Sequence, residues 1–159
     1  MTAQEVIKLL DLKPLDMEGG YFRRNYCSLE KTEQGKPMGT AIFFLLTPDS
    51  FSRMHRLPTD EVYHFYLGDP VELLLLSPNR EGSIIKLGSE LKQGMQVQTV
   101  VPGGTWQGSR LSDGGRWALL GTTMAPGFTD ADFVPAQPEE LKKMYPQFAK
   151  KIEQLTWEK

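Results

Sequence analysis

The sequence predicts an all-β fold, either a sandwich or a barrel, with short helices at both ends. Short apolar or alternating runs follow one another from Thr40 to about Thr123, and turns rich in Pro, Gly and Asp separate them. Closely spaced strands of this kind favour a sandwich or barrel over alternating βαβ units. The leucine-rich run 71–76 is too short for a helix between two proline-bearing turns. The expected strands are 40–46, 61–67, 71–76, 83–87, 96–101 and 116–123.

Helical patterns occur only at the two ends of the chain. Residues 2–12 form an amphipathic pattern, in which Thr2 and Glu5 fit a capping box, and Pro14 ends it. The tail from Pro138 onward is helical with an interruption at Pro146. We therefore expect a single domain over residues 1–159, with an N-terminal helix at about 2–12, a β-barrel at about 20–134 and C-terminal helices at about 138–157.

Composition and charge narrow the range of partners and locations. The net charge of −2 gives no electrostatic reason to expect nucleic acid or an anionic membrane as a partner. No segment has the length of uninterrupted apolar sequence that a membrane helix needs. Cys27 is the single cysteine, so no internal disulfide forms, and we expect its thiol to be buried as a small hydrophobe. A cytoplasmic soluble protein is the expectation.

The stretch 52–68 holds the densest set of chemically useful side chains, including both histidines of the protein. Strand alternation places Glu61, Tyr63 and Phe65 on one face and His64 on the other. An inward carboxylate among aromatic side chains is costly unless it is paired or bound, so Glu61 is a candidate site residue. The alternative is a surface Glu61 paired with a nearby arginine. His55 is expected in the loop before this strand, where binding residues often lie.

A second candidate segment is 101–107, which runs Val-Pro-Gly-Gly-Thr-Trp-Gln. Its glycines permit a tight turn and a close approach of the backbone. Trp106 and Gln107 would then emerge at the start of the next strand. The alternative is that the segment is only a structural hairpin.

Together the two segments resemble the cupin superfamily. In the first cupin motif a glutamate precedes a glycine by seven positions, as Glu61 precedes Gly68 here. The second motif contains Pro-x-Gly and then a ligand histidine, whose place Gln107 takes. Arg53 stands where the motif has its first histidine. The resemblance implies a double-stranded β-helix, or jelly roll, with a small-molecule pocket in its mouth.

Four segments, two of which overlap those above, resemble one branch of cupins that is classified as being of unknown function. They are residues 18–24, 52–70, 100–106 and 125–128, in that order along the chain. Members of this branch are described as predicted sugar epimerases and form barrels that pair into dimers. The resemblance implies a homodimer. Segment 21–27, which a polar loop separates from the main β run, could add a strand to the neighbouring subunit.

The cupin comparison also bears on metal binding. A typical cupin site uses three histidines and a glutamate, a set suited to iron, manganese or zinc. At the matching places this chain offers His55, Glu61 and Gln107, and these would be the ligands if a divalent metal were bound. An amide is a weak ligand, and Arg53 would repel a cation, so we expect no cofactor.

Two functional hypotheses follow. The first is a metal-independent acid–base isomerase or epimerase on a carbohydrate-like or anionic substrate, as in the dTDP-sugar 3,5-epimerases that this fold resembles. In it His55 is the base, oriented by Glu61 or Asp60, and the acid is Tyr21 or Tyr63. The ligand-binding candidates are Arg24, Ser52, Arg53, Arg56, Trp106 and Gln107.

The second hypothesis is a non-catalytic binding module, in which aromatic side chains line the barrel and hold an aromatic ligand. These side chains would be Phe44, Tyr63, Phe65, Trp106 and Trp117. A metal-dependent cupin enzyme is a third alternative.

Overall fold

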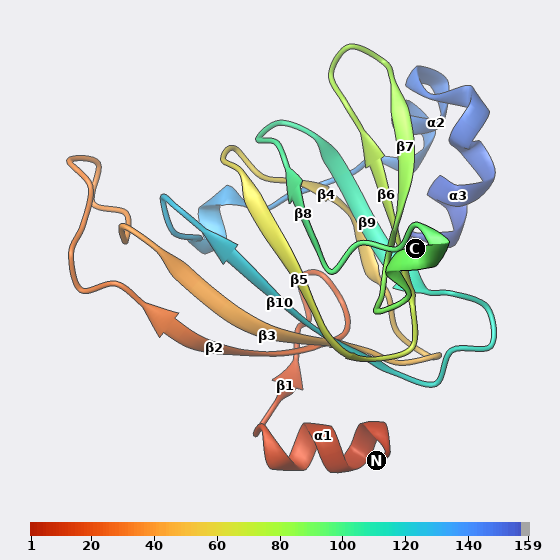
Figure 1. The fold of residues 1–159 in the computed structure, drawn as a ribbon. Coiled ribbons are helices and arrows are strands. Elements are labelled where there is room, and N and C mark those ends of the chain that lie inside the picture. The colour runs from red at the N-terminus through yellow and green to blue at the C-terminus, as the bar shows by residue number, and fades with distance from the viewer. Residues whose placement is uncertain (157–159) are drawn as a thin grey trace.

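Two antiparallel sheets face each other in the computed structural model, which describes residues 1–156 (Figure 1). The larger sheet has six strands in the order β1-β2-β3-β10-β5-β8. Their bounds are β1 Lys13–Pro14, β2 Tyr21–Cys27, β3 Thr40–Leu46, β10 Ala118–Met124, β5 Glu61–Gly68 and β8 Gln98–Val101. Between β2 and β3 a long hairpin projects from one side of the molecule (Figure 1).

The smaller sheet has five strands in the order β11-β4-β9-β6-β7. Their bounds are β11 Val134–Pro135, β4 Ser52–Arg56, β9 Trp106–Leu111, β6 Val71–Leu76 and β7 Gly82–Leu87. From β3 to β11 the chain crosses repeatedly between the two sheets, which is the connectivity of a jelly roll. The all-β prediction is confirmed.

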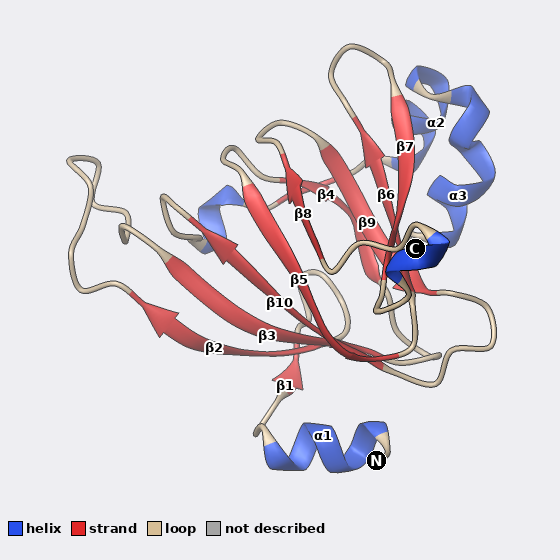
Figure 2. Cartoon of the chain, viewed as in Figure 1, coloured by secondary structure: helices blue, strands red, loops and turns tan. Residues whose placement is uncertain are grey.

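Short helices cover the outside of the sheets (Figure 2). Helix α1, Ala3–Leu9, begins with the expected Thr2–Glu5 capping box and packs Val6 beside Leu45 and Trp117. At the other end α2, Pro138–Met144, and α3, Ala149–Gln154, pack on the smaller sheet through Tyr145 and Ile152. Three 3-10 helices complete the described elements: η1 Leu91–Gln93, η2 Asp130–Asp132 and η3 Pro146–Phe148. Because the helices lie outside, the space between the sheets is left to strand side chains.

The expected strands all form, within a few residues at their ends. One local prediction is wrong: residues 52–56 are strand β4 and not a loop, because Ser52 and Met54 are buried in the smaller sheet despite the charged Arg53 between them. The end of the predicted C-terminal helix, residue 157, lies outside the described residues. Cys27 is exposed at the end of β2, so the prediction of a buried thiol is also wrong.

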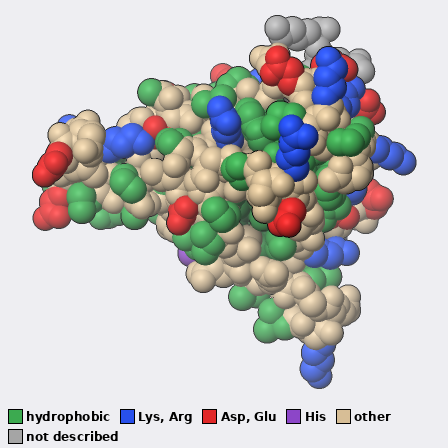
Figure 3. Space-filling model, turned by 90° about the horizontal axis from the view of Figure 1, so that it is seen from above, with side chains coloured by type: hydrophobic (Ala, Val, Ile, Leu, Met, Phe, Trp, Pro, Cys, Tyr) green, Lys and Arg blue, Asp and Glu red, His purple; other side chains and the backbone are tan. Residues whose placement is uncertain are grey.

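Segment 21–27, strand β2, pairs with β1 and β3 of its own chain. Lysine and arginine side chains are interspersed with aspartate and glutamate on the face shown in Figure 3, as the small net charge leads one to expect. Among the described residues no helix has the length and apolar character needed to cross a membrane.

Candidate functional site

A cavity of about 450 Å³ opens at one end of the barrel, between the larger sheet and the loops that flank it. Its wall is mainly apolar. The apolar lining residues are Leu15, Met17, Phe22, Ile42, Leu57, Met124 and Phe128, and the polar ones are Glu18, Arg24, Thr40, Glu61, Thr122 and Asp130. A cavity of this size, apolar with a few convergent polar groups, is typical of a small-molecule site.

Glu61 is the first residue of β5 and points into this cavity with a side chain that is almost wholly buried. Gln107 on β9 donates a hydrogen bond from Nε2 to Glu61 Oε2 at 2.9 Å. Burial raises the pKa of Glu61, and the nearby Glu18 raises it further, while His55, Thr122 and Gln107 oppose the shift. The predicted inward orientation of Glu61 is confirmed, and the alternative of a surface residue paired with arginine is wrong.

Glu18 is a second carboxyl group in the wall, from the loop between β1 and β2. Ser52 Oγ donates to Glu18 Oε1, and the Arg53 amide donates to the Glu18 carbonyl oxygen at 2.9 Å. The loop turns at Gly20, where φ is +70° and an added Cβ would lie 2.9 Å from the Leu45 carbonyl oxygen. The Glu18 side chain is half-buried: part of it is accessible from the cavity, and protein surrounds the rest. This burial raises the pKa of Glu18 to about 7, with Ser52 and Arg53 opposing the rise.

His55 is buried behind the cavity and is not one of its lining residues. It pairs with Gln107 across β4 and β9. Its Nδ1 lies 2.7 Å from the Arg53 carbonyl oxygen, which can only accept, so Nδ1 carries a proton. The ring stacks on Phe133 at 4.8 Å between centroids. Burial lowers the pKa of His55, although the charge of Glu61 opposes this, so the imidazole is neutral near pH 7.

The structure brings His55, Glu61 and Gln107 together, as the cupin motif implies, but their donors do not suit a metal ion. Gln107 uses its amide N–H on the Glu61 carboxylate, and its buried Oε1 has no hydrogen-bond partner in the described part of the chain. Only one imidazole and one carboxylate remain as strong ligands. Within residues 1–156 no group of three or more His, Cys, Asp or Glu side chains could hold one ion. His64 lies on the opposite face of β5, as predicted, and contacts Thr123.

The two tyrosines proposed as acids lie away from the cavity wall. Tyr63 is buried in the core below it, where burial and the nearby Glu61 and Glu18 raise its pKa well above the usual value. A phenol held in this way does not release its proton near neutral pH. Tyr21 packs beside α1, on the other face of β2 from the cavity-lining Phe22. The assignment of Tyr21 as the acid is therefore not supported, because strand alternation turns it outward.

Of the predicted arginines, only Arg24 lines the cavity, where its guanidinium lies 5.9 Å from the Phe128 ring centroid. Arg53 lies over the Phe133 ring, and Arg56 is exposed and stacks on Trp106 at 4.8 Å. Ser52 does not line the wall but positions Glu18.

The expected aromatic lining of the barrel is wrong. Trp106 packs with the C-terminal helices, and Trp117 packs with α1. Phe44, Tyr63 and Phe65 fill the core.

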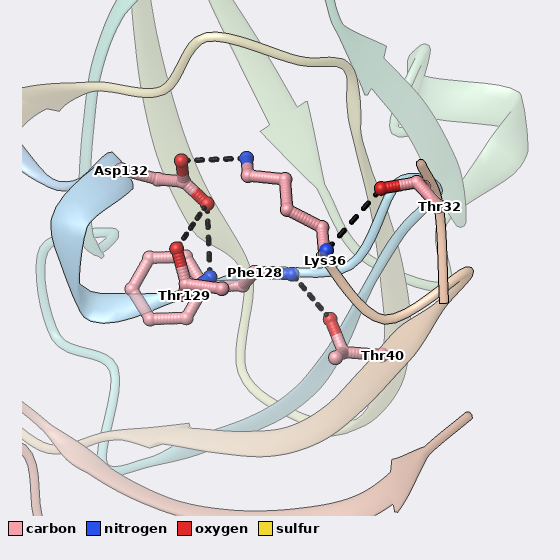
Figure 4. Close-up of polar contacts among 6 residues, drawn as sticks. All are labelled: Thr32, Lys36, Thr40, Phe128, Thr129 and Asp132. Carbon is pink, nitrogen blue, oxygen red and sulfur yellow. Dashed lines mark hydrogen bonds and ion pairs between the residues drawn. The ribbon is translucent and has the colours of Figure 1, made fainter. Parts of the chain in front are cut away.

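The loop that carries Phe128 and Asp130 to the cavity mouth is fastened to the β2–β3 hairpin (Figure 4). Lys36 forms an ion pair with Asp132 at 2.6 Å, and Thr40 Oγ1 accepts a hydrogen bond from the Phe128 amide at 2.9 Å. Asp132 also caps the loop at Thr129. We call residues 125–133 with the Lys36–Asp132 pair the strap.

Sequence reasoning did not identify Glu18, Phe128 or Asp130 as site residues. Glu18 and Phe128 lie in segments 18–24 and 125–128, which matched the cupin branch, but Glu18 was interpreted only as part of a turn. The two glycines that follow it were the available signal, because they let the chain fold a carboxylate back toward the barrel.

Comparison with known proteins shows the family to which the chain belongs. The sequence profile described as cupin superfamily, DUF985, matches residues 4–136. An uncharacterised protein of Saccharomyces cerevisiae, YML079W, is 29% identical over 146 residues, which cover 80% of this chain and 72% of the yeast protein.

Solved structures agree with this assignment. Protein SO0799 of Shewanella oneidensis has a TM-score of 0.93 at 33% identity, covering 100% of this chain and 99% of its own. A hypothetical protein of Leishmania major has a TM-score of 0.91 at 32% identity, covering 99% and 100%. Oxalate decarboxylase of Bacillus subtilis has a TM-score of 0.57 at 13% identity, with 89% of this chain matching 36% of the enzyme, which shows a shared fold and no more.

Proposed function

The chain belongs to the cupin superfamily, in the family described as DUF985, and from that premise we propose that its cavity binds a small molecule and transfers protons on it without a metal ion. The reaction class is isomerisation or epimerisation. The observation that carries the proposal is Glu61, a buried carboxyl with a raised pKa in the wall of a mainly apolar cavity. A carboxyl group whose pKa is raised by burial can both accept and release a proton during a reaction.

Glu61 replaces His55 as the proposed base. Epimerisation next to a carbonyl begins when a base removes a proton from carbon, so the base must reach the ligand. Glu61 lines the cavity, whereas His55 is buried behind it. His55 and Gln107 support Glu61, through its electrostatic surroundings and a hydrogen bond.

The wall favours a substrate with a largely apolar body and an enolisable carbonyl group. A carbohydrate would leave many hydroxyl groups without partners against the Leu, Ile, Met and Phe side chains of the cavity. The arginine-rich segment 52–56 suggested an anionic ligand, but Arg53 and Arg56 do not line the cavity. Among residues 1–156, the lining contains three acidic side chains, Glu18, Glu61 and Asp130, and one cationic side chain, Arg24.

Deuterium exchange into small carbonyl compounds tests the proposal. The protein is incubated in heavy water with phenylacetone, glyceraldehyde and ketobutyrate, which represent apolar, hydroxyl-rich and anionic probes, and exchange is followed by NMR. We expect exchange into phenylacetone, unchanged after chelator treatment, and a loss of about 100-fold or more for Glu61→Gln. Glu139→Gln, on the exposed surface of α2, is the matched control and should leave the rate unchanged.

The same experiment distinguishes the second candidate, a non-catalytic binding module, which the same cavity also favours. In that case phenylacetone binds, as ligand-observed NMR detects, but no variant or wild-type protein exchanges its protons. Loss of exchange on chelation would instead support a metal-dependent cupin enzyme.

We also propose that two copies pair through the part of the outer face of the larger sheet that α1 leaves uncovered. Exposed Tyr66 and Val100 lie there, and Tyr66 contacts Phe43 and His64. The outer face of the smaller sheet, by contrast, is covered by the C-terminal helices. The resemblance to dimeric cupins makes a second copy the expected occupant. Light scattering after size exclusion should give a dimer for the wild type and a monomer for Tyr66→Lys with Val100→Lys; a monomeric wild type would contradict the proposal.

A further inference from the structure

Arg24 is a cation at the mouth of a mainly apolar cavity. It lies on β2, is exposed, and is the single cationic side chain of the lining among residues 1–156. Its guanidinium lies 5.9 Å from the centroid of the Phe128 ring, which belongs to the strap. In the part of the chain that the structure describes, this guanidinium forms no ion pair and no hydrogen bond. An aromatic ring beside a guanidinium covers it from one side and leaves N–H groups at its edge available to a ligand.

We infer that Arg24 determines the specificity of the cavity by binding a carboxylate group of the substrate, which is then an oxo acid with an apolar segment between its carboxylate and its carbonyl group. The inference rests on the proposed function for the carbonyl end and adds the anionic end. A planar guanidinium can hold a carboxylate through two parallel N–H···O bonds. One arginine balances the single charge of a carboxylate, whereas a phosphate group would bring up to two negative charges to the same place.

The strand register separates Arg24 from the proposed base. Arg24 pairs with Ile42 on β3, Ile42 pairs with Thr122 on β10, and all three line the cavity. Glu61 lies on β5, the strand beyond β10. Strands β2 and β5 are thus three strand spacings apart, which is about 14 Å along the sheet. Side chains stand roughly perpendicular to a sheet, so a ligand that contacts both Arg24 and Glu61 extends across the cavity, over the apolar Ile42.

The acidic side chains of the lining leave Arg24 free to attract an anion. Glu18 is held against β4 of the smaller sheet, by the Ser52 hydroxyl and the Arg53 amide. Asp130 lies on the strap but is exposed, so solvent screens its charge, and it forms no ion pair with Arg24. A carboxylate held by Arg24 at the mouth is therefore kept away from the buried carboxyl groups deeper in the cavity.

Binding of a matched pair of ketones tests the inference without catalysis. 5-Oxo-5-phenylpentanoate and valerophenone share a phenyl ketone and its chain, and differ in having a carboxylate or a methyl group at the chain end. In ligand-observed NMR titrations we expect wild type to bind the acid about tenfold more tightly than the neutral ketone, and Arg24→Gln to lose this preference. Arg24→Lys keeps the charge without the paired N–H groups and should retain part of it. Arg80→Gln, exposed in the turn between β6 and β7, is the control and should retain all of it.

The preference is a ratio of two affinities measured in one protein, so a general loss of folded protein does not imitate its loss. Equal affinity of the wild type for the two ketones would overturn the inference. A preference for the acid that survives in Arg24→Gln would overturn it as well, because another group would then bind the carboxylate.

The deuterium exchange assay, run with the same two ketones, separates failure of this inference from failure of the proposed function. If the preference for the acid depends on Arg24 but wild-type protein exchanges no proton of either ketone, the anionic site is supported and the isomerase activity fails. If wild-type protein exchanges both ketones equally well and Glu61→Gln abolishes both reactions, the proposed function stands and the role of Arg24 is wrong.

Discussion

The two ends of the barrel interior are built from the same strands but have opposite character. On β3, Phe44 and Leu46 fill the core at one end, while Thr40 and Ile42 face the cavity at the other. On β10, Leu120 belongs to the core and Thr122 to the cavity wall. The packed end therefore stabilises the fold. The hollow end has less side-chain packing, because it contains the cavity and its ionisable groups.

The largest effect that we predict contrasts two positions on one strand. Phe44→Ala removes a wholly buried ring from the packed end and should lower the free energy of unfolding by about 3–5 kcal/mol. Ile42→Ala at the hollow end should cost only about 1–2 kcal/mol, because its side chain already borders open space. Urea unfolding of both variants measures the difference, and equal losses would show that the two ends are packed alike.

A second, smaller effect concerns the charge at the hollow end. Because the pKa of Glu18 is raised from 4.5 to about 7, the folded state binds its proton more tightly than the unfolded state does. Stability from this proton is complete below the unfolded pKa and is lost as the pH rises through about 7. Glu18→Gln should therefore match the wild type in stability at low pH and exceed it, by at most about 3 kcal/mol, at alkaline pH.

Urea unfolding of wild type and Glu18→Gln at about pH 5 and about pH 8 tests the sign of this effect. The exposed Glu139→Gln variant supplies the control, in which the difference from wild type should not grow with pH. If Glu18→Gln lowered the free energy of unfolding by the same amount at both pH values, the Glu18 pKa would not be raised in the folded state, and the side chain would have a structural role instead.

The smallest predicted effect concerns the strap that frames the hollow end. Lys36→Met removes the partner of Asp132, a carboxylate that is 8% exposed, and should lower the free energy of unfolding by about 1 kcal/mol. Lys13→Met, which breaks the exposed pair with Asp11, is the control and should have little effect. We also expect Lys36→Met to weaken phenylacetone binding, since the strap carries Phe128; unchanged affinity would mean that the pair is only a surface contact.

Several side-chain positions at the hollow end could be predicted from the sequence. The alternation in β5 placed Glu61 inward and His64 outward, and both orientations are confirmed. The prediction that His55 and Gln107 lie near Glu61 rested on the cupin resemblance, and the pairing of β4 with β9 brings the three together. Arg53 and Arg56 were predicted to bind ligand but do not line the cavity, because position in the sequence does not say whether a guanidinium faces the cavity.

The sequence by itself determined the all-β class, most of the strand positions and the capped N-terminal helix, because these depend on local periodicity and turn chemistry. Only the tertiary structure decided that Glu18 and Glu61 line one cavity, and that Tyr21 and Trp106 face away from it. Which strands are neighbours, and which loops fold over the mouth, depends on contacts between residues far apart in the chain. A local pattern specifies the face of a strand but does not specify what lies opposite that face.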